Sequence, residues 1–162
     1  MHFDRIKKHP PAALLGLASL LLGLAACASN AAGPMQQTLP TVQVLVGSHT
    51  VNAELANTDS TRQIGLMNRS ALANNSGMLF VFKRRESQCM WMKNTLIDLD
   101  VAFADENGKI LNVEQMKAGT TDIHCSKGDA KLALEMNLNW FAGRNISAGD
   151  MLKVPENAMQ AE

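Results

Sequence analysis

The sequence contains no tyrosine and only seven aromatic residues in all, two Trp and five Phe among 162 residues. It also lacks an excess of charge of either sign, because 15 Lys and Arg balance 15 Asp and Glu. This balance excludes the strongly basic surface that nucleic-acid binding requires, so we expect no nucleic-acid partner. With 46% hydrophobic and 19% charged residues, the chain has the composition of one globular domain and is too apolar for intrinsic disorder.

The first 26 residues have the organisation of an export signal. Three basic residues among the first nine precede an uncharged, Leu- and Ala-rich run over residues 12–28. A membrane-spanning helix needs about 20 apolar residues, and the run stops short of that length. We therefore interpret residues 1–26 as a cleaved signal peptide rather than as a retained span.

The end of this run resembles the lipobox of bacterial lipoproteins, with the sequence LAAC over residues 24–27. The resemblance implies cleavage before Cys27, acylation of its thiol and anchoring in a membrane. Ala28 and Ser29 follow Cys27 in place of an Asp, which favours the periplasmic face of the outer membrane. The alternative is cleavage at the Ala-x-Ala site around Cys27, which would leave a soluble periplasmic or secreted protein.

Removal of the signal peptide would leave 136 residues with 12 basic and 14 acidic side chains, a formal charge of −2. Residues 27–40 are uncharged, largely polar and interrupted by Pro34 and Pro40, so they are predicted to form a flexible tether. We expect one folded domain over residues 41–155 and a short C-terminal tail over residues 156–162.

Acylation of Cys27 would leave Cys89 and Cys125 as an even pair in a compartment that favours oxidation. A disulfide between them would close a loop of 36 residues, since 125 − 89 = 36. Such a loop is worth about 4 kcal/mol of stability in the chain-entropy account. The alternative is a reactive or metal-binding thiol at Cys89 or in the dipeptide His124-Cys125, although the sequence contains no Cys-x-x-Cys motif.

Hydrophobic periodicity predicts a β-rich domain. A hairpin is expected over residues 41–55 around a Gly47-Ser48 turn, and Thr58 is expected to cap a helix from Asp59 to Met67. The further expected strands cover residues 78–82, 88–93, 96–104, 109–116, 131–137 and 151–154, with a short helix near Trp140 and Phe141. The predicted fold class is mainly β (α+β), a compact barrel-like or wrapped sheet of seven to eight short strands with one or two short helices.

The predicted connections and strand faces follow from polar residues. Residues 83–86 are all charged and predict a solvent-exposed reversal, and residues 117–129 predict a loop. Over residues 96–104, alternation places the large apolar side chains on a core face and Asp98 and Asp100 on an opposite, polar face.

Six residues are candidates for a binding surface, because polar groups near the ends of predicted strands converge on a barrel rim or cleft. They are Trp91, Lys93, Asn94, Asp100, Glu135 and Arg69. Asp98 and Asp100 are spaced for a carboxylate pair with separated pKa values, which is the arrangement of a glycan-acting enzyme. Glu114 and Glu135 lie on similarly polar faces of predicted strands. The alternative, which we favour, is that these acids cover a solvated sheet face. Trp91 fits either a stacking platform for a sugar or peptide or a core anchor.

The chain has ten methionines, of which six lie inside the predicted domain core or near His124: Met67, Met78, Met90, Met92, Met116 and Met136. Thioethers are ligands for copper(I), so a soft-metal carrier is one hypothesis. Methionine also fills irregular cores, and most of these residues have apolar neighbours. We favour the core interpretation and predict no metal and no cofactor.

Five motifs occur in order along the predicted domain: Arg62–Arg69 (RQIGLMNR), Gly77–Phe82 (GMLFVF), Trp91–Phe103 (WMKNTLIDLDVAF), Ala133–Asn137 (ALEMN) and Ile146–Asp150 (ISAGD). Together they resemble the domain of unknown function 192 family, also called uncharacterised protein family 0127. The resemblance implies a compact, β-rich single domain that is often exported or lipid-anchored, without an established activity. Asp98 stands where the family usually has Pro. Asn139 and Asn145 stand where Gly is expected, which favours left-handed backbone at both positions.

These observations predict an envelope lipoprotein that acts as a binding or accessory module, with an envelope protein or a glycan as its ligand and the membrane reached through Cys27. A hydrolase or transglycosylase that acts on envelope glycan through the carboxylates is the second hypothesis. A copper-binding protein is the third. The sequence favours the non-enzymatic interpretation without deciding it.

Overall fold

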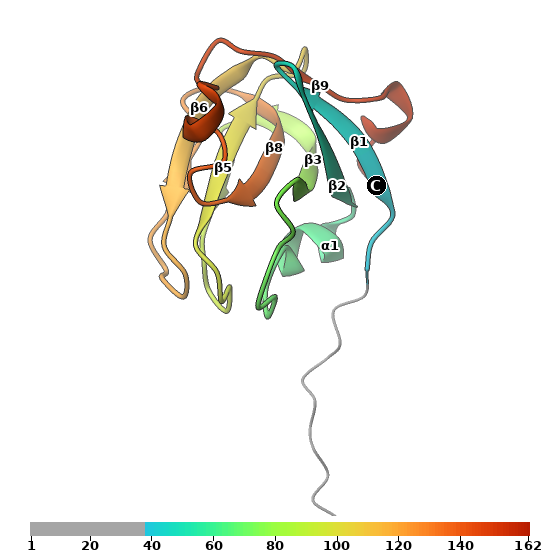
Figure 1. The fold of residues 1–162 in the computed structure, drawn as a ribbon. Helices are drawn as coiled ribbons and strands as arrows, with labels where there is room; N and C mark the ends of the chain where they lie inside the picture. The colour runs from blue at the N-terminus through green and yellow to red at the C-terminus, as the bar shows by residue number, and fades with distance from the viewer. Residues whose placement is uncertain (1–37) are drawn as a thin grey trace, which may run out of the picture. The chain divides into compact units, whose positions relative to one another are not determined.

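The computed structural model describes residues 38–162 (Figure 1). The predicted signal peptide, the lipidation site Cys27 and most of the tether lie outside the described residues. No helix within residues 38–162 is long and apolar enough to cross a bilayer.

The described chain is mainly β, as the sequence predicts, and contains nine strands, one α-helix and two 3-10 helices. In chain order these are β1 (Thr41–Val46), β2 (His49–Ala56), α1 (Asp59–Ile64), β3 (Ser76–Glu86), β4 (Cys89–Met90), β5 (Leu99–Ala104), β6 (Ile110–Met116), β7 (His124–Cys125), β8 (Ala130–Asn137), η1 (Ala142–Arg144), β9 (Leu152–Lys153) and η2 (Glu156–Ala158). Seven strands form one sheet in the order β6-β5-β8-β3-β2-β1-β9, and β4 pairs with β7 in a separate two-stranded sheet.

The large sheet curls into a half-barrel (Figure 1). All pairings in it are antiparallel except that of β2 with β3, which the crossover through α1 makes parallel. The two ends of the sheet meet where Lys109 bridges Met151 and where the Leu152 N–H donates to the Gly108 carbonyl at 2.7 Å. A Cβ on Gly108 would lie 2.0 Å from the Leu152 carbonyl oxygen, so the closure requires glycine there.

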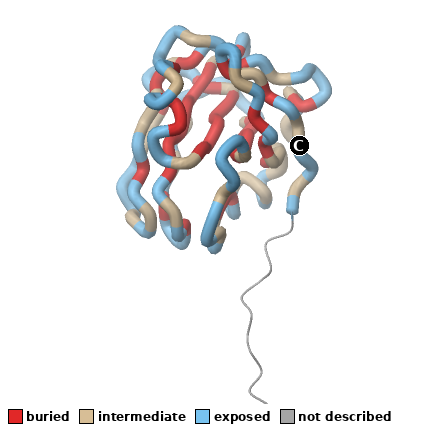
Figure 2. Tube along the Cα trace, in the orientation of Figure 1, coloured by how far each residue is buried: buried red, intermediate tan, exposed pale blue. Residues whose placement is uncertain are grey.

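The curl divides the apolar side chains into two cores. The inner core collects residues from strands at both ends of the sheet, such as Val44 on β1 and Ile110 on β6, and therefore lies inside the curl. The outer core lies on the opposite face of β3, β5 and β8 and includes Leu66 and Met92 from the segments that cover this face. Every residue of β5 is consequently buried, and buried residues follow the central strands in Figure 2.

This two-sided burial corrects one sequence prediction. The face of β5 that carries Asp100 was expected to be polar and solvated, yet Asp100 is 2% exposed and its neighbours Ala102 and Ala104 belong to the inner core. Alternation along a strand reveals which residues share a face, but it does not reveal whether another layer covers that face.

Capping and turn residues in the sequence predict where turns and helix starts lie, but they predict the ends of helices and strands less accurately. Thr58 caps α1 as predicted, accepting a hydrogen bond from the Thr61 N–H at 3.1 Å, but the helix ends at Ile64 because Gly65 turns the chain with φ of 51°. Residues 83–86 continue β3 instead of reversing it, and the predicted strand over residues 88–93 shortens to the two residues of β4. The predicted loop over residues 117–129 contains β7.

Two further predictions are confirmed. Asn139 and Asn145 have positive φ values of 66° and 56°, as expected for residues that replace glycine in left-handed backbone. Four of the six methionines proposed as core filler are buried, namely Met78, Met92, Met116 and Met136.

Candidate functional site

A pocket of about 300 Å³ opens on the outer face of the sheet, between α1 with its following turn and the segment that begins with β4. Four of the five sequence motifs contribute residues to its lining, together with β4. The lining residues are Arg62, Gln63, Ile64, Gly65, Leu66, Met67, Phe80, Phe82, Cys89, Met90, Trp91, Thr95 and Glu135. This pocket, called the α1–β4 pocket below, is the candidate functional site.

Glu135 is the one carboxyl that lines the α1–β4 pocket. It lies on β8, in register with Met78 of β3 and Val101 of β5, so its side chain shares the outer face with these apolar residues. Glu135 is 4% exposed and lines the pocket, and no residue within 38–162 forms a hydrogen bond or ion pair with its carboxyl. Burial alone raises the pKa of Glu135 to about 8, so the carboxyl is mostly protonated at neutral pH. The expectation that Glu135 lies on a solvated face is therefore wrong.

The wall formed by α1 contains a cation that is already engaged elsewhere. The Arg62 guanidinium donates hydrogen bonds to the carbonyls of Asn57 and of Val81, the latter at 2.8 Å, and pairs with Asp59. The guanidinium forms no ion pair with Glu135, although both residues line the pocket. The pKa of the Asp59 carboxyl is lowered by its hydrogen bonds to Lys83 and Arg62.

The turn after α1 brings its backbone against the pocket floor. Gly65 has a positive φ of 51°, and a Cβ there would lie 3.3 Å from Cζ of Phe80. Glycine therefore serves two requirements at this position, the left-handed turn and the close approach to the ring. The next residue, Leu66, is 2% exposed and belongs to the outer core.

Trp91 forms part of the pocket rim. Its side chain is 46% exposed, and Ile64 on the opposite wall is 47% exposed. The Lys93 ammonium lies 5.4 Å from the centre of the Trp91 ring, in a cation–π arrangement. The core-anchor interpretation of Trp91 is therefore wrong. The buried residue of this segment is its neighbour Met92, which is 0% exposed.

The structure brings three of the six predicted site residues together and separates the others. Glu135 and Trp91 line the pocket, and Lys93 lies against Trp91. Arg69 instead pairs with Glu54, with 2.8 Å between Nη2 and Oε2.

Asp100 lies on the opposite side of the sheet from the pocket. It aligns with Met136 of β8, whereas Glu135 aligns with Val101, so the two carboxyls point to opposite faces. Asp100 Oδ1 is buried without a hydrogen-bond partner, and burial raises the pKa of this carboxyl against the influence of the backbone N–H groups of Asn139 and Phe141. Asp98 is exposed and accepts a hydrogen bond from the Ala118 N–H at 2.7 Å. The two carboxyls proposed as a pair therefore differ in environment, with Asp98 exposed and Asp100 buried.

Asn94 has a backbone role. Its φ is 61°, and its carbonyl accepts a hydrogen bond from the Asn68 N–H at 2.8 Å. Asn68 also has a φ of 61°. The hydrogen bond between these two left-handed asparagines therefore links the RQIGLMNR motif to the WMKNT motif. Asn94 supports the geometry of the site and does not line it.

The role of Asn94 gives a first prediction. Asn94→Gly should retain stability and pocket geometry, whereas Asn94→Ala should lower the free energy of unfolding by about 1 kcal/mol, because a Cβ without a local hydrogen-bonding group disfavours left-handed backbone. Urea denaturation of both variants measures this difference. Equal losses in the two variants would instead assign the role to the Asn94 side chain.

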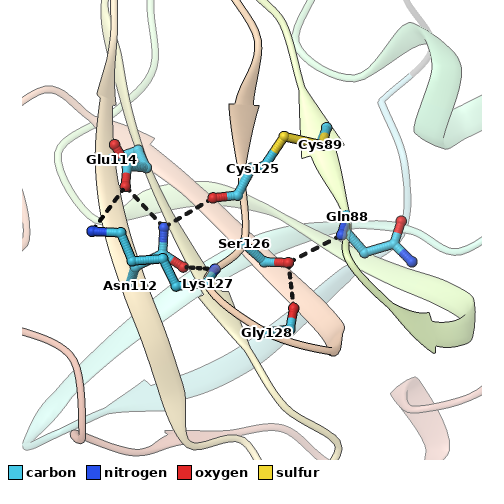
Figure 3. The surroundings of a disulfide bond; sticks show 8 residues. All are labelled: Gln88, Cys89, Asn112, Glu114, Cys125, Ser126, Lys127 and Gly128. Atoms are coloured by element: carbon cyan, nitrogen blue, oxygen red, sulfur yellow. Dashed lines mark hydrogen bonds and ion pairs between the residues drawn. A yellow bond between two sulfur atoms is a disulfide. The ribbon is translucent and has the colours of Figure 1, made fainter.

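Cys89 and Cys125 form the predicted disulfide, with Cα atoms 4.0 Å apart across the β4–β7 pair. Figure 3 shows the contacts around it: the Asn112 side chain donates to the Cys125 carbonyl at 3.1 Å, and the Gln88 N–H donates to Ser126 Oγ at 3.0 Å. Because Cys89 also lines the pocket, the disulfide fixes one pocket wall to the loop over residues 117–129.

Several lining residues were not among the sequence-predicted site residues. Phe80 and Leu66 were assigned only to a strand and a helix, Met90 was weighed only as core filler or a copper(I) ligand, and Thr95 was given no role. A usable signal was Gly65, because a glycine next to a helix end within a motif indicates a close backbone approach.

Comparison with known proteins gives a family but no activity. The family model DUF192, described as "Uncharacterized ACR", matches residues 42–154. A Sinorhizobium meliloti structure described as a "putative transcription regulator" is 32% identical, with a TM-score of 0.69 over 74% of this chain and 97% of that chain. A Novosphingobium aromaticivorans protein of unknown function is 28% identical, with a TM-score of 0.70 over 75% of this chain and 89% of that chain. No curated protein matches the sequence.

Proposed function

The chain belongs to the DUF192 family, and on that premise we propose that it is a cell-envelope binding module whose ligand enters the α1–β4 pocket. The observation that carries the proposal is the composition of this pocket. Apolar side chains form most of its lining, beside Arg62 and Gln63 on α1, and the two buried polar residues among them are Thr95 and Glu135, of which only Glu135 carries a carboxyl. A concave, mostly apolar pocket with few polar groups is typical of sites for small ligands or for single side chains of larger ligands.

Sequence features outside residues 38–162 support the envelope location. A basic segment and an apolar run precede Cys27 in a lipobox-like sequence, and residues 27–40 have the composition of a tether. A disulfide within the domain fits an oxidising compartment. In this proposal the acyl group on Cys27 holds the domain at the periplasmic face of the outer membrane. Cleavage without acylation would give a soluble periplasmic or secreted form of the same module.

No specific observation favours the other functions. The α1–β4 pocket contains one carboxyl, whereas glycoside hydrolysis generally uses two that flank the bond. Residues 38–162 include no group of three His, Cys, Asp or Glu placed to hold a metal ion, and of the six methionines only Met67 and Met90 line the pocket. The regulatory description of the Sinorhizobium protein is not carried over, because this chain has no excess of basic residues.

Binding of hexan-1-ol tests the proposed function. In ¹H–¹⁵N NMR spectra of the domain, the alcohol should shift the signals of residues 62–67 and 89–95, which line the pocket from both sides. Trp91→Ala should weaken this binding about five-fold, or ~1 kcal/mol, through lost ring contacts. Leu138→Ala is the matched control, because Leu138 is an exposed apolar residue that does not line this pocket. Shifts that are absent, or scattered over the surface, would contradict the proposal.

A further inference from the structure

We propose that the α1–β4 pocket selects an alkylammonium cation, whose charged group binds the Glu135 carboxyl while its hydrocarbon chain packs against Phe80 and Trp91. This inference rests on the proposed function and names the class of ligand. It follows from the lack of hydrogen-bond donors to Glu135 within the described residues and from the Lys93 ammonium that lies over Trp91 at the rim.

Glu135 lacks every partner that a buried carboxyl usually has. It is 4% exposed, and within residues 38–162 no side chain or backbone N–H donates a hydrogen bond to it. A buried carboxyl without donors is costly, so a ligand gains most by supplying them. An ammonium supplies three N–H donors and a compensating charge, whereas a carboxylate or phosphate supplies neither.

The charged residues around Glu135 leave this position open for a cation. On α1, Arg62 is held by the carbonyls of Asn57 and Val81 and by Asp59. On β8 itself, Lys131 shares the face of Glu135 but donates to the Lys83 carbonyl at 3.1 Å.

The residues directly across from Glu135 on the two neighbouring strands are uncharged. The neighbours across β3 and β5 are Met78 and Val101, and Asp100 points to the inner core. At the rim, the Lys93 ammonium lies over the ring of Trp91. In the described part of the chain, no cation therefore pairs with the ionised form of Glu135, and a cationic ligand would supply that charge.

The rim and walls fit the remainder of such a ligand. The Lys93 ammonium lies 5.4 Å from the centre of the Trp91 ring. The ring is therefore placed to form a cation–π contact with a cation at the rim. Deeper in the pocket, Leu66, Phe80 and Met90 provide an apolar surface for a hydrocarbon chain. The volume of about 300 Å³ limits the ligand to a compact molecule or a single long side chain.

Binding of the cation requires ionisation of Glu135, which makes affinity depend on pH. Since the pKa of Glu135 is about 8 without ligand, the ionised fraction rises about fifty-fold between pH 6 and pH 8. An alkylammonium stays protonated over this range, as a lysine side chain does. Its affinity should therefore rise by about the same factor, and each binding event should release close to one proton at pH 6. His124 on β7 lies in register with Met90, which lines the pocket, so a His124 variant serves as a control.

Isothermal titration calorimetry with three probes of one shape tests the inference: hexylamine, hexan-1-ol and hexanoate, each at pH 6, 7 and 8 in two buffers of different ionisation heat. We expect hexylamine to bind most tightly at pH 8, with affinity about fifty-fold higher than at pH 6 and with proton release. Hexan-1-ol should bind without this dependence, and hexanoate most weakly. Glu135→Gln should abolish the pH dependence and the preference for the amine, whereas His124→Gln should leave both unchanged.

The outcomes separate this inference from the proposed function. Binding of hexan-1-ol and hexylamine with equal, pH-independent affinity would overturn the alkylammonium assignment and leave a pocket for apolar ligands. Tighter binding of hexanoate would overturn it as well. Failure of both the alcohol and the amine to bind would overturn the proposed function together with the inference. The pH series on the unchanged protein decides among these outcomes even if Glu135→Gln does not fold.

Discussion

Replacing Glu135 by Gln should make the protein more stable than the unchanged chain at pH 9, while the two should have similar stability at pH 5. The pKa of Glu135 is raised by burial to about 8, against an ordinary value of 4.5. A carboxyl with a raised pKa favours the folded state fully below its unfolded pKa. This contribution is lost as pH rises towards the folded pKa, because the unfolded chain ionises first. The loss begins above about pH 4.5 and is complete near pH 8.

The expected magnitude is large for a single residue. A pKa difference of about 3.5 corresponds to at most about 5 kcal/mol in the free energy of unfolding. Urea denaturation of both proteins at pH 5, 7 and 9 measures it, and the difference between the two curves isolates Glu135 from every other titrating group. Asp100→Asn is the matched control, because the pKa of Asp100 is also raised by burial but its carboxyl faces the other core. Parallel curves for Glu135→Gln and the unchanged protein would contradict a buried, unpaired Glu135.

Loss of the disulfide should lower stability by about 4 kcal/mol. The Cys89–Cys125 bond closes a loop of 36 residues, and in the chain-entropy account a cross-link of this span restricts the unfolded chain by about that amount. Cys89→Ser with Cys125→Ser removes the bond while retaining two small polar side chains. Denaturation of this double variant, compared with the unchanged protein with and without reductant, measures the effect.

The same double variant should also bind hexan-1-ol more weakly. Cys89 lines the pocket, and this bond holds β4 in place together with its two-residue pairing with β7. The neighbouring contacts of Asn112 and Ser126 remain and should keep the loop near its place (Figure 3). A double variant with unchanged stability and unchanged binding would show that the disulfide is dispensable for the site.

The features that could be predicted from the sequence are those with a local cause. The turn at Gly47-Ser48 and the cap at Thr58 each depend on the backbone preference of one or two residues. The cysteine pair followed from the count of cysteines left after export. The left-handed conformations of Asn139 and Asn145 followed from the residues they replace.

The features that could not be predicted depend on contacts between distant segments. Alternation places Glu135 on the same face of β8 as Ala133, but only the folded chain shows that α1 and the segment after β4 cover this face. For the same reason the burial of Asp100 on the inner face was missed, because the curl that encloses it depends on β6 meeting β9. Trp91 was ambiguous because a two-residue strand followed by a turn has no distinctive hydrophobic period.

The account depends most on one group, a carboxyl that lies buried and unpaired in an apolar pocket. A ¹³C NMR titration of the side-chain carboxyl of Glu135 in the ligand-free protein, assigned by comparison with Glu135→Gln, tests this claim directly. The account predicts a titration midpoint near 8. A midpoint close to the ordinary value of 4.5 would show that water or a donor reaches Glu135, and it would contradict both the proposed site and the class of ligand inferred from it.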